Sequence, residues 1–167
     1  MTRHEEWHVT VSADPVRWHV ACLDMCIKPL YIELNNFERQ LMCVAPFNPC
    51  ERIMQRGIPI IRVKHEVSEL APDETACYWE CHLKFNGPFQ PGLPWSSRDL
   101  YRPARWYVTH RQAHPFTEEV VTRIRERVSD RTTHPTLGWH TGPSEFASYE
   151  YEACTLDSNP ELDGRWS

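Results

Sequence analysis

Two short segments of the sequence each carry a glutamate and a histidine two residues apart, Glu6-Trp7-His8 and Glu80-Cys81-His82. Both segments alternate polar and apolar residues, which predicts a β-strand. Side chains two positions apart in a strand point to the same face. Each glutamate therefore lies beside its histidine, and the pair could transfer protons, ligate a metal or simply form an ion pair.

The same alternation predicts a polar face on other strands. The polar sets are Glu6, His8 and Thr10; Arg62, Lys64 and Glu66; Tyr78, Glu80, His82 and Lys84; Arg105, Tyr107, Thr109 and Arg111; and Glu150 and Glu152. Helices cover the apolar side of a sheet, so these residues share the other face. That face is either the solvated side of an antiparallel sheet or the wall of a groove.

A groove with this mixture of acids and bases suits a small anionic ligand. We predict catalytic roles for His8, His82 and Glu80. The residues expected to bind the ligand are Thr10, Lys84, Arg105, Tyr107 and Arg111. No metal ligand is assigned, and the sequence identifies no cofactor.

The order of predicted elements defines the expected fold. Residues 5–70 predict a strand, a helix starting at Asp14-Pro15, two strands, a short helix and a fourth strand, the ferredoxin-like β-α-β-β-α-β unit. Residues 76–158 repeat this order in part, with a short helix at 96–101 and no counterpart of the strand at Leu30. The prediction is a single α+β domain over 1–167, built from two tandem ferredoxin-like halves, the second incomplete, whose open polar faces form a groove.

His8-Val9-Thr10 on the first strand of such a duplicated arrangement resembles half the signature of the two-histidine phosphoesterases. In that family each half supplies a His-x-Thr/Ser, and the two histidines act as acid and base on a phosphodiester. The resemblance implies a phosphoesterase-type hydrolase that acts on a small phosphorylated or nucleotide-like substrate. The second half departs from the pattern, because His82-Leu83-Lys84 has lysine where Thr or Ser belongs.

Three alternatives remain open. The Glu-x-His pairs, with Glu66 or Glu152, could bind a divalent metal, as in the paired-module enzymes of the glyoxalase type. The sets at Glu80 and Glu150 are similar to the triphosphate-tunnel enzymes, in which a charged sheet surrounds a polyphosphate, although their Glu-x-Glu-x-Lys is not present. A non-catalytic nucleotide-binding or protein-interaction module would use the same polar groove.

Composition limits the partners and the compartment. The net charge of −5 argues against a general nucleic-acid binder, so nucleic acid is expected only through a local basic patch within 98–131. No apolar run approaches the length of a membrane span, and the N-terminal residues do not resemble a signal peptide. Seven cysteines, an odd number, are expected to be reduced thiols in the cytoplasm.

Overall fold

The structure is a computed structural model that describes residues 3–89, 93, 95–133 and 144–162. The strands and helices, in chain order, are β1 (Glu5–Val11), α1 (Pro15–Asp24), β2 (Lys28–Leu34), β3 (Arg39–Ala45), α2 (Cys50–Gln55), β4 (Ile60–Val67), β5 (Tyr78–Asn86), β6 (Ser96–Asp99), β7 (Arg102–Gln112), α3 (Glu118–Thr133) and β8 (Glu145–Asp157).

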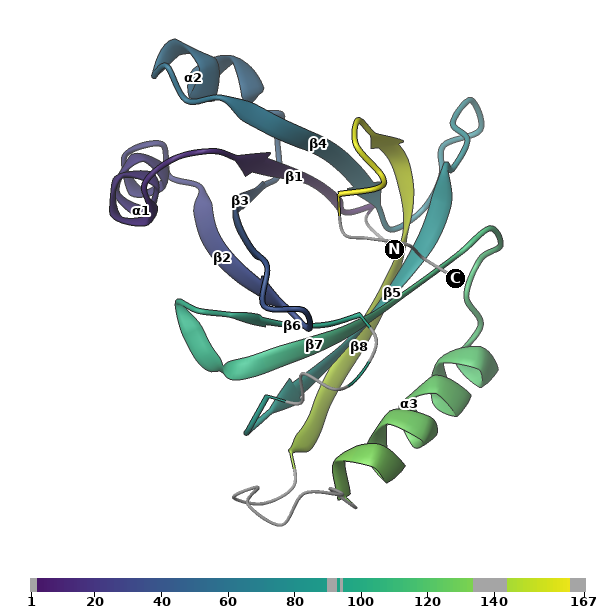
Figure 1. The fold of residues 1–167 in the computed structure, drawn as a ribbon. Helices are drawn as coiled ribbons and strands as arrows, with labels where there is room; N and C mark the ends of the chain where they lie inside the picture. The colour runs from purple at the N-terminus through teal and green to yellow at the C-terminus, as the bar shows by residue number, and fades with distance from the viewer. Residues whose placement is uncertain (1–2, 90–92, 94, 134–143, 163–167) are drawn as a thin grey trace.

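The strands form a closed barrel in the order β1-β3-β2-β6-β7-β5-β8-β4 (Figure 1). Every neighbouring pair is antiparallel. The first four strands lie in the order β4-β1-β3-β2, and the last four lie in the corresponding order β8-β5-β7-β6. Pairing of β2 with β6 and of β4 with β8 joins the two sets and leaves no open sheet edge.

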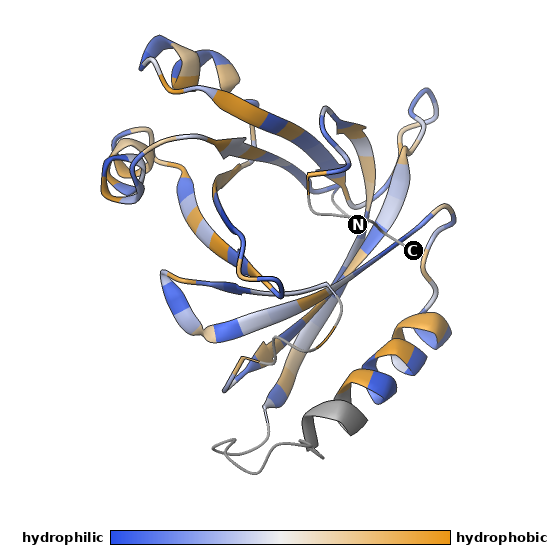
Figure 2. Ribbon diagram, viewed as in Figure 1, coloured by the Kyte–Doolittle hydropathy of each residue, from blue (hydrophilic) through white to orange (hydrophobic). Residues whose placement is uncertain are grey.

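Figure 2 shows that polar and apolar residues alternate along the strands. On β1, β5 and β7 the apolar residues pack against the helices, which lie on the outside of the barrel (Figure 1). One buried cluster joins β1 and β3 to α1 and α2, with Val9, Trp18, Cys43 and Ile53 fully buried. A second joins β5 and β7 to α3 through residues such as Leu83, Trp106 and Val121. The alternate residues, which are mostly polar, therefore point into the barrel.

The predicted ferredoxin-like fold is wrong. The polar faces do not form a groove between two open-faced halves, because all eight strands close into one barrel. With that fold, the classification of the chain as a phosphoesterase of the two-histidine type also loses its structural basis and is not retained. The predicted short helix at 96–101 is wrong as well, because Ser96–Asp99 is strand β6 and pairs with both β2 and β7.

The N-terminal cap of α1 gives a first prediction. The Asp14 carboxylate accepts hydrogen bonds from the backbone N–H groups of Val16 and Arg17, both at 3.1 Å, and Pro15 occupies the first turn. Replacing such a cap with alanine typically costs about 1 kcal/mol. We expect Asp14→Ala to lower the free energy of unfolding by about this amount in urea denaturation. Asp24→Ala, at the opposite end of α1, is the matched control and should not destabilise the protein.

None of the helices in the described part of the chain is long and apolar enough to cross a membrane.

Candidate binding site inside the barrel

The barrel interior contains a cavity of about 260 Å³. Strands β1, β4 and β5 contribute charged residues to its wall, namely Glu6, His8, Arg62, Lys64, Glu80 and His82. An eight-stranded barrel is just wide enough to be filled by side chains or to hold one small ligand. Charged side chains in so confined a space must pair with one another or with a ligand.

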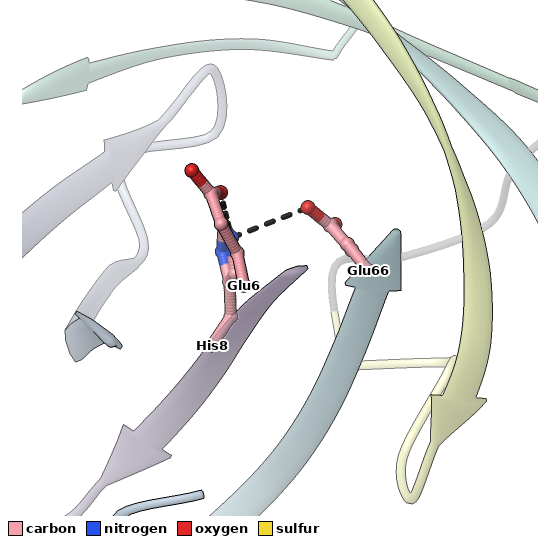
Figure 3. Close-up of side chains that lie close together, drawn as sticks. All are labelled: Glu6, His8 and Glu66. Carbon is pink, nitrogen blue, oxygen red and sulfur yellow. Dashed lines mark hydrogen bonds and ion pairs between the residues drawn. The ribbon is translucent and has the colours of Figure 1, made fainter. Parts of the chain in front are cut away.

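The first group of charged side chains lies where β1 meets β4. Glu6 pairs in register with Glu66 across the two strands. His8 Nε2 lies 3.0 Å from Glu6 Oε2 and 3.2 Å from Glu66 Oε2 (Figure 3). Glu66 is only 1% exposed, whereas the Glu6 side chain is 42% exposed, so this group extends from the buried interior toward solvent.

The corresponding group in the second set of strands lies where β5 meets β8. Glu80 pairs in register with Glu152, as Glu6 does with Glu66. His82 Nε2 lies 3.2 Å from Glu80 Oε2 and 3.9 Å from Glu152 Oε1. The two Glu-x-His pairs therefore occupy equivalent positions in the barrel, on the first strand of each set.

The buried basic side chains of the interior are already paired with carboxylates. Lys64 Nζ lies 2.7 Å from Glu66 Oε1 and 2.8 Å from Glu80 Oε1. Arg111 donates to Glu80 at 2.8 Å. Arg62 donates to both oxygens of Asp157, at 2.9 and 2.7 Å. An anion that entered the cavity alone would have to compete with these carboxylates.

The ionisation of the interior follows from burial and these contacts. Burial opposes the charge on Glu66 and Glu80, but His8 and Lys64 lower the pKa of Glu66, while Lys64 and His82 lower that of Glu80. Burial also opposes the charge on His82, yet its carboxylate neighbours, Glu80 first, raise its pKa to about 9. Burial and the charge of Glu66 raise the pKa of Glu152 to about 9. At neutral pH His82 is therefore cationic and Glu152 is neutral.

Glu66 joins two groups of potential metal ligands. One consists of Glu6, His8 and Glu66, the other of Glu66, Glu80 and His82, and the ligand atoms within each lie no more than 4.8 Å apart. Both oxygens of Glu66 and the Nε2 atom of His82 lack a hydrogen-bond partner of suitable geometry among the described residues, although ion-pair partners are close. Carboxylates and neutral imidazole suit divalent cations such as Mn²⁺, so Glu6, His8 and Glu66 fit a metal site, whereas His82 would first have to lose its proton.

The structure brings together some of the predicted site residues and separates others. His8, His82, Glu80 and Tyr107 line the cavity, and Arg111 reaches it through its contact with Glu80. The other three predicted site residues lie elsewhere in the barrel.

Thr10, Lys84 and Arg105 do not line this cavity. Thr10 is buried beside a different hollow near Ser12 and Leu41, and Arg105 is exposed. These three residues therefore lie apart from the cavity that His8 and His82 line, and their role in ligand binding stays a prediction.

Several cavity residues were absent from the predicted site. Arg62 and Lys64 belong to the polar set of their strand, so alternation alone could have included them. Glu66, expected only as an additional metal ligand, is shared by both groups. The apolar residues Leu30, Ile32 and Met42 also line the cavity, and no polar pattern could have identified them.

Comparisons of the chain with protein-family models, with curated proteins and with solved structures gave no match.

Proposed function

We propose that the barrel is a metal-dependent enzyme that acts on the phosphate group of a small phosphorylated, nucleotide-like ligand inside the cavity. The observation that carries this proposal is Glu66, a buried carboxylate that lies between two Glu-x-His pairs and whose oxygens find no hydrogen-bond partner of suitable geometry among the described residues. A divalent cation bound there would supply the positive charge that attracts phosphate oxygens.

The pairing of the basic side chains supports the need for a cation. Lys64 and Arg111 already contact Glu80, so little of their charge is available to an anion. A cation bound by Glu6, His8 and Glu66 would add positive charge where these paired side chains reach toward solvent. Of the alternatives raised by the sequence, a charged sheet that surrounds a polyphosphate agrees best with a closed barrel whose interior is charged.

The chain's own residues would then bind and orient the phosphate. Tyr107 and Thr109 line the same cavity and carry hydroxyl groups that can donate hydrogen bonds to phosphate oxygens. Thr109 Oγ1 lies 2.9 Å from His82 Nδ1 and fixes the orientation of the imidazole. The raised pKa of His82 keeps this ring protonated at neutral pH, so it can donate a proton in a hydrogen bond but cannot act as a base while it is paired with Glu80.

Glu66→Gln tests the proposal. Titration calorimetry with Mn²⁺ should show stoichiometric binding to the wild-type protein. The substitution should weaken that binding at least tenfold, an effect that loss of even an outer partner of a metal site can produce. Glu5→Gln is the matched control, because Glu5 lies on β1 beside Glu6 but is exposed and pairs with Arg3. Absence of Mn²⁺ binding, or equal binding to Glu66→Gln, would contradict the metal site.

Activity is measured as Mn²⁺-dependent release of phosphate from ATP. We expect release by the wild-type protein and by Glu5→Gln, and its loss in Glu66→Gln. Binding of ATP with Mn²⁺ but without release would reduce the function to that of a binding module.

A further inference from the structure

The wall of the cavity is divided into a charged part and an apolar part. Strands β2 and β3 turn apolar side chains inward, namely Leu30, Ile32 and Leu34 from β2 and Met42 and Val44 from β3. Most of the charged residues lie on β1, β4 and β5 of the same cavity, with Lys28 at the start of β2 and Glu150 on β8. Because β3 is the neighbour of β1 in the barrel, the apolar wall borders directly on the strand that carries Glu6 and His8.

This division does not follow from the packing of the protein. The two buried hydrophobic clusters lie outside the barrel, beneath the helices, and include none of these five residues. The five side chains are only partly buried and border the open cavity. Apolar side chains on the wall of a hollow interior are stabilised when an apolar part of a ligand removes them from water.

Trp95 gives the apolar wall an aromatic group. Trp95 lines the cavity, and its backbone φ is 54°. A positive φ is unusual for a bulky residue, and such strain is concentrated at functional sites. The Trp95 ring lies 5.6 Å from that of His110 in a T-shaped contact, which restricts its position. An indole at the edge of an apolar wall can stack on a flat ring.

Polar side chains on the same side of the cavity can recognise the edge of such a ring. Asn35, Gln40 and Ser97 line the cavity beside the apolar residues. The Asn35 amide nitrogen donates to Leu93 O at 3.2 Å, which leaves its oxygen as an acceptor directed elsewhere. A few placed polar groups within an apolar wall are typical of sites that bind a heterocycle, whereas an alkyl chain would use none of them.

We infer that the ligand of the barrel is a nucleoside polyphosphate, whose base lies on the apolar wall beside Trp95 and whose phosphates extend toward Glu66. This inference rests on the proposed function and specifies its substrate class. Inorganic triphosphate would fill only the charged part of the cavity and would leave the apolar wall in water. A cavity of about 260 Å³ takes one small molecule rather than a polymer.

The test compares the affinities of ATP, GTP, CTP and UTP with that of inorganic triphosphate, by titration calorimetry of the Mn²⁺-loaded protein. We expect at least one nucleotide to bind about tenfold or more tightly than inorganic triphosphate, which corresponds to the contribution of one stacked base. Trp95→Ala and Ile32→Asn should each remove most of this difference and leave the affinity for inorganic triphosphate unchanged. Val20→Asn, on the exposed face of α1, is the control and should change neither affinity.

The possible failures are distinguishable. Equal affinities of the nucleotides and inorganic triphosphate for the wild-type protein would overturn the inference and leave the proposed function intact. The inference would also be overturned if Trp95→Ala lowered the affinity for the nucleotides and for inorganic triphosphate equally. Absence of binding of every triphosphate would instead overturn the proposed function. Since Trp95 is only partly buried, Trp95→Ala keeps the test valid if Ile32→Asn does not fold, which thermal denaturation would reveal.

Discussion

Replacement of Lys64 by methionine is expected to destabilise the folded protein by about 3–5 kcal/mol, because it leaves the buried Glu66 carboxylate without its nearest cation. The Lys64 side chain is 8% exposed and contacts two carboxylates that are each 1% exposed. Burial disfavours its charge, yet Glu66 and Glu80 outweigh this effect and keep its pKa above the ordinary value. After the substitution Glu80 retains Arg111, whereas the one ion pair that Glu66 retains among the described residues is with His8.

The measurement is urea denaturation at pH 7 in the presence of a chelator. Lys84→Met is the matched control: Lys84 lies on β5, is partly buried and makes no ion pair among the described residues, so its loss should change stability by less than about 1 kcal/mol. The double variant Lys64→Met/Glu66→Gln should recover much of the loss, because it removes the charge that was left unpaired. A loss below about 1 kcal/mol for Lys64→Met would mean that water, rather than Lys64, compensates Glu66.

The local structure could largely be predicted from the sequence, because it depends on neighbouring residues. Alternation identified the strands at Trp7, Leu41 and Val63, and Asp14-Pro15 marked the start of α1. The strand Ser96–Asp99 was missed because it is only four residues long and polar, so its pattern resembles a capped helix turn. Its strand conformation depends on pairing with β2 and β7, a contact that no local pattern records.

The closure of the barrel could not be predicted, for a related reason. Alternation separates a polar face from an apolar face but does not indicate whether the polar face meets solvent or encloses a cavity. The answer depends on whether the edge strands β2 and β4 find partners, and β6 and β8 supply them from 63 or more residues later in the chain. Because the barrel closes, the polar face became an interior, and residues toward one end of a strand, such as Lys84 and Arg105, fell outside the cavity.

Part of the candidate site could be predicted from the sequence. The two Glu-x-His pairs were identified from spacing alone, and the barrel places both of them on one cavity. Their common partner Glu66 could be named only as one option, since its proximity to both pairs depends on β4 and β5 lying on either side of β8 and on side chains that meet across the interior. No sequence pattern indicated the apolar wall on β2 and β3, because its residues resemble those of an ordinary hydrophobic core.

The metal-free protein is expected to lose stability as the pH rises from about 6.5 to about 9. The carboxylates around His82 raise its pKa from 6.5 to about 9, so the folded protein retains a proton that the unfolded chain releases. The stabilisation is complete below pH 6.5 and disappears as the pH passes 9. Each pKa unit corresponds to about 1.4 kcal/mol, which gives about 3 kcal/mol as an upper limit. The side chain is 21% exposed, and screening by water reduces this value.

Glu152 contributes to the same trend and allows it to be tested. Its pKa is raised from 4.5 to about 9, so the folded state also retains this proton where the unfolded chain has lost it, and stability again falls with rising pH.

Glu152→Gln mimics the neutral acid. The variant should therefore be more stable than the wild-type protein near pH 9, and its stability should depend less on pH. Urea midpoints between pH 6.5 and 9 in the presence of a chelator measure both effects. Glu145→Gln, exposed near the other end of β8, should follow the wild-type curve. Stability that is constant or rises over this range would show that neither His82 nor Glu152 retains its proton, and that the interior is hydrated well enough for its charges to titrate as they do in water.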